Sequence, residues 1–172
     1  MLIMDDMAGR RALIEASGLQ TGRVLDVGMG NCGCMAIFLA RDGFHVVGID
    51  RSSEAVRRSI KDAQDESFPG TFEARVANAE KLPFGENEFD AVFAYHALHH
   101  MKNVEQVIAE MFRVCKPSGF VLIADLNAKG CKVYKESVDE ILLNTIECCM
   151  KENMQSVRKV ETEYNFMFIC QK

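Results

Sequence analysis

The feature that most constrains the fold is a glycine-rich segment between an expected strand and an expected helix. Residues 26–33 (DVGMGNCG) overlap and follow the apolar run Arg23–Val27, and they precede residues 34–42, whose apolar side chains recur at helical spacing. Glycines at such a place let the backbone turn sharply and approach a ligand closely. Asp50 ends the next apolar run, 22 residues past the first glycine. Nucleotide-binding folds place there the carboxylate that accepts hydrogen bonds from ribose hydroxyls.

Short apolar runs and helical patterns alternate along the rest of the chain. Five strands are expected at Arg23–Val27, His45–Asp50, Thr71–Val76, Phe89–Tyr95 and residues 120–125. Helices are expected around residues 10–17, 34–42, 104–115 and 138–149, and a further helix, capped by Ser52 or Ser53, carries Val56 and Ile60. Residues 116–119 (KPSG) end the helix at 104–115. Residues 155–171 are expected to form two strands joined by a turn near residues 161–163.

This order of elements predicts one α/β domain. Alternating strands and helices imply a Rossmann-like, doubly wound, mostly parallel sheet with helices on both faces. Two strands joined by a tight turn must be antiparallel, so a C-terminal antiparallel hairpin completes the seven strands. We expect a single domain over residues 1–172, in which residues 1–22 form a short helical segment and no full lid.

Charge and cysteine content narrow the location and the partners. Twenty basic and twenty-five acidic residues give a net charge of −5, which disfavours non-specific binding to nucleic acid. Arg57, Arg58 and Lys61 fit one solvated helix face. The seven cysteines are an odd number, and we find no signal-peptide pattern and no apolar run as long as a membrane span. These observations favour a cytoplasmic protein with reduced thiols, most of them in the core.

The glycine pattern suits two kinds of adenosine-containing cofactor, and their charges distinguish them. A nicotinamide dinucleotide would place a doubly negative pyrophosphate against the loop. Asp26 lies two residues before the first glycine, so we expect its carboxylate near that loop. Two like charges about 4 Å apart at an effective dielectric constant of ~20 repel by roughly 4 kcal/mol. S-adenosylmethionine has no phosphate and carries positive ammonium and sulfonium groups, so Asp26 favours this cofactor.

Three further segments carry a family resemblance. They are residues 78–84 (NAEKLPF), residues 89–92 (FDAV) with Leu98–His100, and residues 113–119 (RVCKPSG). Together with residues 25–30 (LDVGMG) and Asp50, they resemble the class I S-adenosylmethionine-dependent methyltransferases, in particular the branch that includes small-molecule methyltransferases of quinone biosynthesis. The resemblance implies an enzyme that transfers a methyl group from S-adenosyl-L-methionine to a small-molecule acceptor.

The resemblance also assigns cofactor-binding roles. It places Gly28, Gly30, Asp26 and Tyr95 near the methionyl part, Asp50 at the ribose hydroxyls, Arg51 beside the adenine, and Asn78 and the Ala79 backbone amide at the adenine edge. The family usually carries aspartate where Asn78 stands. Because an amide oxygen still accepts a hydrogen bond from an amino group, we expect weaker binding there and no loss of it.

The histidines after the fourth expected strand are candidates for a second role. If that segment is helical, His96, His99 and His100 share one face, a spacing that suits a metal once a carboxylate or cysteine completes the set. The alternative is a polar rim around the acceptor pocket, and we favour it and predict no metal site. His100 is the first candidate, and His96 the second, for a base that takes a proton from the acceptor. Cys32 and Cys34 are interpreted as small residues beside the ligand.

Two other functions stay open at this stage. Only about 22 residues precede the first strand, and residues 126–132 are too few for a lid. This favours an open site, covered in a homo-oligomer or by a partner subunit, and leaves room for a non-catalytic S-adenosylmethionine-binding subunit or sensor. A nicotinamide-dependent oxidoreductase is the third reading, which Asp26 disfavours. The identity of the acceptor is not readable, because one fold serves many chemistries.

Overall fold

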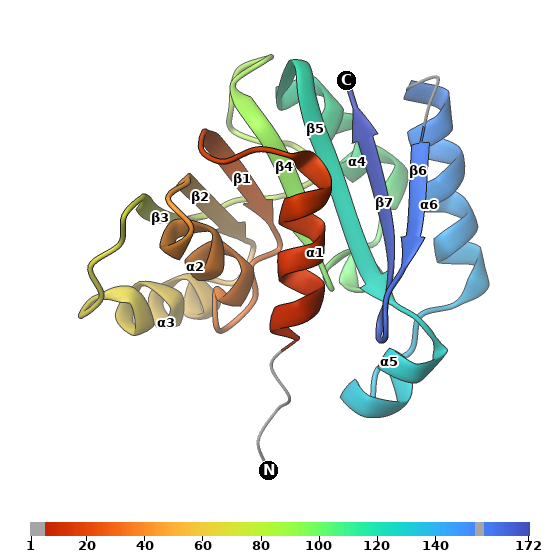
Figure 1. The fold of residues 1–172 in the computed structure, drawn as a ribbon, viewed down its shortest axis with the longest axis horizontal. Helices are drawn as coiled ribbons and strands as arrows, with labels where there is room; N and C mark the ends of the chain where they lie inside the picture. Colours follow the sequence, from red (N-terminus) through yellow and green to blue (C-terminus); the bar gives the residue numbers. More distant parts are fainter. Residues whose placement is uncertain (1–5, 154–156) are drawn as a thin grey trace.

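The computed structural model describes residues 6–153 and 157–172, which form a seven-stranded sheet flanked by helices (Figure 1). The strand order is β3-β2-β1-β4-β5-β7-β6, and β7 runs antiparallel to both of its neighbours. The strands are β1 (Arg23–Val27), β2 (His45–Asp50), β3 (Thr71–Val76), β4 (Phe89–Tyr95), β5 (Cys115–Leu126), β6 (Val157–Glu161) and β7 (Asn165–Gln171). The prediction of a mostly parallel sheet with a C-terminal antiparallel hairpin is confirmed.

The helices cover the two faces of the sheet. They are α1 (Met7–Ser17), α2 (Cys34–Arg41), α3 (Ser53–Ala63), α4 (Val104–Val114), α5 (Ala128–Tyr134) and α6 (Glu140–Asn153). Helices α1, α2 and α3 lie over one face, and α4 and α6 lie over the other (Figure 1). Burial on both faces explains why β1, β2 and β4 are continuous apolar runs in the sequence.

Each face of the sheet has its own apolar core. Leu13 of α1 and Phe38 of α2 pack with Val24 and Phe93 on one side. Strand residues that point the other way pack against α4 and α6, and this second core extends to Phe168 of β7. The strand order reverses between β1 and β4, which is where doubly wound sheets bind ligands beyond the carboxyl ends of the strands.

The structure differs from the prediction at two elements. Strand β5 begins at Cys115, directly after α4, so residues 116–119 belong to the strand instead of to a turn before it. The ends of the β5–β7 ladder hold this segment, because the N–H of Ser118 donates to the carbonyl of Lys172 at 2.7 Å and the N–H of Lys172 donates to that of Gly119. Helix α5 was not predicted. The side chain of Asn127 caps it by accepting from Lys129 N and Gly130 N.

The cysteines depart from the expectation in state and in place. Cys32 and Cys34 are joined by a disulfide, so the expectation of reduced thiols throughout is wrong for this pair. The other five form no disulfide in the described residues, and of these Cys115 and Cys170 are buried, so most of the cysteines are not in the core. Within the described ranges, no helix is both long enough and apolar enough to cross a membrane.

Candidate functional site

A cavity of about 600 Å³ lies at the carboxyl ends of the central strands, where the strand order reverses between β1 and β4. Its size is in the range that ligand pockets occupy. Eight of the ten residues predicted for the site line it, and these are Gly28, Gly30, Asp50, Arg51, Asn78, Ala79, His96 and His100. Met101, Lys102 and Val107 close the side toward α4. The cavity therefore joins the glycine loop, the acid that ends β2 and the histidine segment after β4.

The glycine loop has a backbone that other residues rarely adopt. Gly28 and Gly30 have φ angles of +76° and +67°, in the left-handed region. The N–H groups of Gly28 and Met29 both donate to the carbonyl of Ile49, at 2.9 and 3.0 Å, which holds the loop against β2. A Cβ at Gly28 would lie 2.8 Å from the Cβ of Ala97, so a side chain does not fit there. Glycine is required at this position for both conformation and space.

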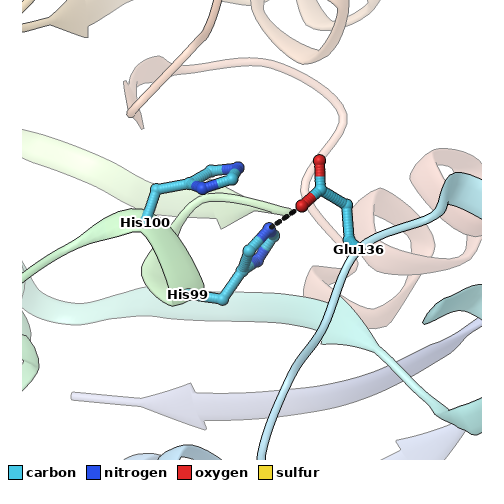
Figure 2. Close-up of side chains that lie close together, drawn as sticks. All are labelled: His99, His100 and Glu136. Atoms are coloured by element: carbon cyan, nitrogen blue, oxygen red, sulfur yellow. Dashed lines mark ion pairs between the residues drawn. The ribbon is translucent and has the colours of Figure 1, made fainter.

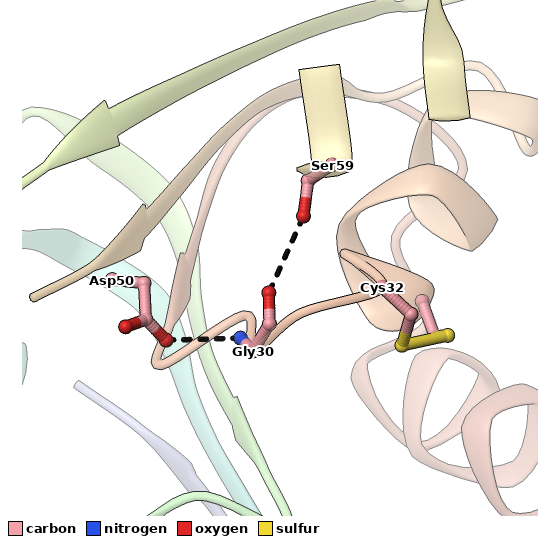
Figure 3. The surroundings of a disulfide bond; sticks show 5 residues. Gly30, Cys32, Asp50 and Ser59 are labelled. Atoms are coloured by element: carbon pink, nitrogen blue, oxygen red, sulfur yellow. Dashed lines mark hydrogen bonds between the residues drawn. A yellow bond between two sulfur atoms is a disulfide. The ribbon is translucent and has the colours of Figure 1, made fainter. Parts of the chain in front are cut away.

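The carboxylate of Asp50 connects β2 to the glycine loop. Its Oδ2 accepts a hydrogen bond from Gly30 N at 3.0 Å (Figure 3), and its Oδ1 accepts one from Ser52 N at 2.8 Å. The loop is also held from α3, where Ser59 Oγ donates to the Gly30 carbonyl at 3.3 Å. A carboxylate has about four acceptor sites, so Asp50 keeps capacity for two ligand hydroxyls after making both bonds.

Asn78 and its neighbours form the far wall of the cavity. The Oδ1 of Asn78 accepts from Glu80 N at 3.0 Å, and the backbone of Asn78 pairs with that of Lys81 in an isolated bridge. The amide side chain is thereby used to shape its own turn. The neighbouring Ala79 and the exposed Arg51 complete this wall. A planar ligand group would be enclosed on this side by the side chains of Arg51, Asn78 and Ala79.

Asp26 lies behind the loop and does not line the cavity. Its exposed fraction is 1%, and within the described residues its Oδ2 has no hydrogen-bond partner. Burial raises the pKa of Asp26 to about 7, and the negative charge of Asp50 adds to this rise. The positive charge of Arg10 and a hydrogen bond from the Ala36 backbone act against it. The carboxyl group therefore titrates near neutral pH, and its contact with a cofactor remains a prediction.

The hydroxyl of Tyr95 belongs to a buried polar network that anchors α1. It donates to Oδ2 of Asp6 at 2.7 Å, and the side-chain amide of Asn165 lies 3.2 Å from the same hydroxyl. Asp6 caps α1 by accepting from Gly9 N. Tyr95 does not line the cavity, and burial raises its pKa above the ordinary value. The sequence analysis missed Asp6 and Asn165. Asp6 had one signal, because an acidic residue before a helix is a typical N-cap.

The three histidines do not share one helical face. His96 lies outside any helix with a φ of +52°, and its Nε2 bonds the side chain of Asn165. Burial lowers the pKa of His96. His99 and His100 lie on a short 3₁₀ helix (Leu98–His100), and only His96 and His100 line the cavity. The basis for a metal site at i, i+3, i+4 spacing is therefore absent.

His99 pairs with β5, and its ring also lies beside that of His100, with the ring centroids 3.9 Å apart. Its Nδ1 pairs with Oδ1 of Asp125 at 2.7 Å, and its backbone N–H donates to Oδ2 of the same carboxylate at 3.3 Å. Although burial lowers it, the hydrogen bond and charge of Asp125 bring the pKa of His99 above its usual value. Asp125, which is fully buried at the end of β5, was not among the predicted site residues.

Comparisons with known proteins agree with this arrangement. Residues 25–123 match the family described as a methyltransferase domain. A ubiquinone/menaquinone biosynthesis C-methyltransferase from Pseudomonas fluorescens is 36% identical over 132 residues, which are 73% of this chain and 52% of that protein. The sterol methyltransferase-like 2 protein of Botryococcus braunii is 34% identical over 101 residues, 59% of this chain and 26% of its own length. The chain thus spans about half the length of the bacterial relative.

Solved structures share the fold at low sequence identity. A SAM-dependent methyltransferase from Aquifex aeolicus superimposes with a TM-score of 0.73 at 20% identity, covering 93% of this chain and 87% of that one. One from Methanosarcina mazei gives 0.72 at 22% identity, covering 93% and 96%. At these identities the likeness concerns the fold alone.

Proposed function

The chain belongs to the methyltransferase domain family, and from this premise we propose that it transfers the methyl group of S-adenosyl-L-methionine to a small-molecule acceptor. The observation that carries the proposal is the carboxylate of Asp50, which holds the glycine loop and keeps free acceptor sites at the cavity. When bound, the cofactor supplies the reactive methyl group on its sulfonium. The protein has to align donor and acceptor and to exclude water.

The residues present fit such a cofactor. Gly28 and Gly30, both with positive φ angles, make the backbone turn sharply at the cavity. An added Cβ at Gly30 would meet no atom within 4 Å, so this glycine borders open space. We assign the ribose hydroxyls to Asp50 and the adenine to the wall around Asn78 and Ala79. A cation held at the loop would favour the ionised form of Asp26 behind it.

A calorimetric titration with S-adenosylhomocysteine tests this assignment. We expect saturable binding to the unmodified chain and strongly weakened binding to Asp50→Ala, because both the ribose contact and the loop anchor are lost. Asp50→Asn keeps one acceptor oxygen, so its affinity should lie between those of the unmodified chain and Asp50→Ala. Asp62→Asn removes an exposed carboxylate on α3 and serves as the matched control. Equal affinity in all four proteins would show that the ribose lies elsewhere.

We assign the role of base to His100, which lines the cavity, with His96 as the second candidate. A neutral imidazole there takes a proton from an acceptor hydroxyl, which makes the oxygen or an adjoining ring carbon nucleophilic toward the methyl group. The bacterial relative's name directs the first trial to the ring carbon of a quinol. His100→Gln should then abolish methylation while S-adenosylhomocysteine still binds. Retained turnover in this variant would remove the role from His100.

Location and assembly are separate proposals. The five cysteines outside the disulfide favour the cytoplasm, whereas the Cys32–Cys34 disulfide does not, so cell fractionation and thiol labelling decide the location. We propose that a second copy or a partner subunit covers the cavity. Sedimentation of the purified chain with and without S-adenosylhomocysteine tests self-association, and a strictly monomeric protein with full activity would refute the need for a cover.

A further inference from the structure

Three potential metal ligands from two separate elements converge beside the cavity. His99 and His100 come from the 3₁₀ helix after β4, and Glu136 comes from the segment that follows α5 (Figure 2). One ligand atom from each of the three residues lies within 4.8 Å of the other two. Glu136 is 36 residues away in the chain, so no local pattern brings it there. Its backbone is held in place by a hydrogen bond from Glu136 N to the Cys131 carbonyl at 3.1 Å.

The buried imidazole of His99 is held with one nitrogen directed into this group. Its side chain is 5% exposed, and Nδ1 is fixed by Asp125, whose side chain is fully buried. In the described part of the chain, the other nitrogen, Nε2, is buried without a hydrogen-bond partner. Histidines that bind metals typically donate their second ring nitrogen to a carboxylate in this way, which fixes the tautomer and the ring orientation. The Asp125–His99 pair has that form.

His99 and Glu136 face each other across a short distance that an ion could bridge. Nε2 of His99 and Oε2 of Glu136 are 4.0 Å apart, as the dashed line in Figure 2 marks. This separation is too long for a hydrogen bond. Two ligands of a tetrahedral ion lie ~3.4 Å apart, so the exposed side chain of Glu136 would move by about half an ångström to bind an ion together with His99. His96, which bonds Asn165, is not part of this group.

We propose that His99, His100 and Glu136 bind one divalent transition-metal ion at the rim of the cavity. Two imidazoles and a carboxylate suit zinc, cobalt or iron(II) better than magnesium or calcium, which prefer oxygen ligands. Three protein ligands leave a coordination position open, as catalytic sites do. Since His100 also lines the cavity, we assign this open position to an oxygen of the acceptor, and this second step rests on the proposed methyltransferase function. With an ion bound, His100 would be a ligand instead of the base, and the ion would lower the pKa of the acceptor hydroxyl.

The metal step is tested without any turnover. Chelator-treated protein is titrated with zinc chloride in a calorimeter and with cobalt(II) chloride by visible absorption. We expect one equivalent of each ion and a cobalt spectrum of a nitrogen- and oxygen-bound site. Glu136→Gln and His100→Gln should weaken zinc binding at least tenfold, and Glu140→Gln, an exposed carboxylate at the start of α6, should not. Absence of saturable binding, or equal affinity in the Glu136 and Glu140 variants, would overturn the site.

Asp125→Asn separates a built site from a surface contact. Removing the charge that orients His99 should cost ~10–100-fold in zinc affinity, as loss of such a supporting carboxylate does elsewhere. Unchanged affinity would mean that His99 Nε2 is not a ligand. Circular dichroism of Asp125→Asn checks that the fold is retained. If this variant does not fold, the metal site is tested with Glu136→Gln, which changes an exposed residue.

The open position is tested with 4-nitrocatechol, whose absorption shifts when its oxygens bind a metal. The cobalt-loaded chain should shift this absorption, and the cobalt-treated Glu136→Gln variant should not. No shift with the loaded chain would refute the open position. S-adenosylhomocysteine binding is measured in parallel on the metal-free protein. Retained S-adenosylhomocysteine binding without metal binding rejects the metal site and leaves the proposed function intact. Metal binding without S-adenosylhomocysteine binding rejects the proposed function and leaves the metal site intact.

Discussion

Replacement of Asp26 by asparagine should stabilise the chain in a pH-dependent way. Asp26 is buried behind the glycine loop, and burial raises its pKa from 3.8 to about 7. The folded state therefore holds a proton that the unfolded chain releases between about pH 4 and 7. In this window the stability of the unmodified protein falls as pH rises. Asparagine keeps an acceptor oxygen for Ala36 and never ionises, so it escapes this loss.

The size of the effect follows from the rise in the pKa. A rise from 3.8 to about 7 corresponds to ~4 kcal/mol of destabilisation once Asp26 is ionised in both states, as at pH 8. At pH 5 the same relation gives ~2 kcal/mol. The advantage of Asp26→Asn over the unmodified chain should thus grow by roughly 2–3 kcal/mol between pH 5 and pH 8. The cost of placing an amide in the site is the same at both values and cancels.

Urea unfolding followed by circular dichroism at pH 5, 6, 7 and 8 measures this difference. Asp62→Asn, which removes an exposed carboxylate, should show no comparable trend. A stability difference between Asp26→Asn and the unmodified chain that stays constant from pH 5 to 8 would refute the reasoning. It would mean that Asp26 titrates at its ordinary pKa and that the charge behind the loop is present at all of these values.

Two further substitutions test the loop and the network under α1. Gly28→Ala should lose ~2 kcal/mol or more in unfolding free energy and lower the affinity for S-adenosylhomocysteine, because φ of Gly28 is +76° and Ala97 lies 2.8 Å from the new Cβ. Gly43→Ala is the control and should lose less, because Gly43 has a φ of +96° and no atom lies within 4 Å of its new Cβ. Equal losses in urea unfolding would contradict the predicted clash with Ala97. Tyr95→Phe should lose ~1–3 kcal/mol of unfolding free energy, because the buried carboxylate of Asp6 then lacks the hydrogen bond from the Tyr95 hydroxyl. Its affinity for S-adenosylhomocysteine in calorimetry should be unchanged. A large loss of affinity would mean that Tyr95 contacts the cofactor.

Most of the fold could be predicted because its central strands are buried on both faces. The bounds of β1, β2 and β4 follow directly from continuous apolar runs such as those of residues 23–27 and 89–95. The start of β5 could not be predicted, since Pro117 and Gly119 are typical of turns, and the ladder with β7 that accommodates them is a non-local contact. Helix α5 is seven residues long, and its only local signal is the cap at Asn127.

The site was predictable where it depends on the loop and on strand ends. Gly28 and Asp50 come together at the cavity because the carboxyl ends of adjacent parallel strands meet at one edge of the sheet. The distance of Asp26 from the cavity was not predictable, because the side-chain direction of a strand residue depends on the pleat. The positive φ of His96 broke the expected helical face. Glu136 reaches the histidines only through the path of α5, which left no pattern in the sequence.

The calorimetric titration of the purified chain with S-adenosylhomocysteine tests the central claim most directly. The account predicts saturable binding of one ligand per chain, strongly weakened in Asp50→Ala, and no comparable binding of NADH. The account would be contradicted by the absence of heat at millimolar S-adenosylhomocysteine, or by saturable binding of NADH in its place.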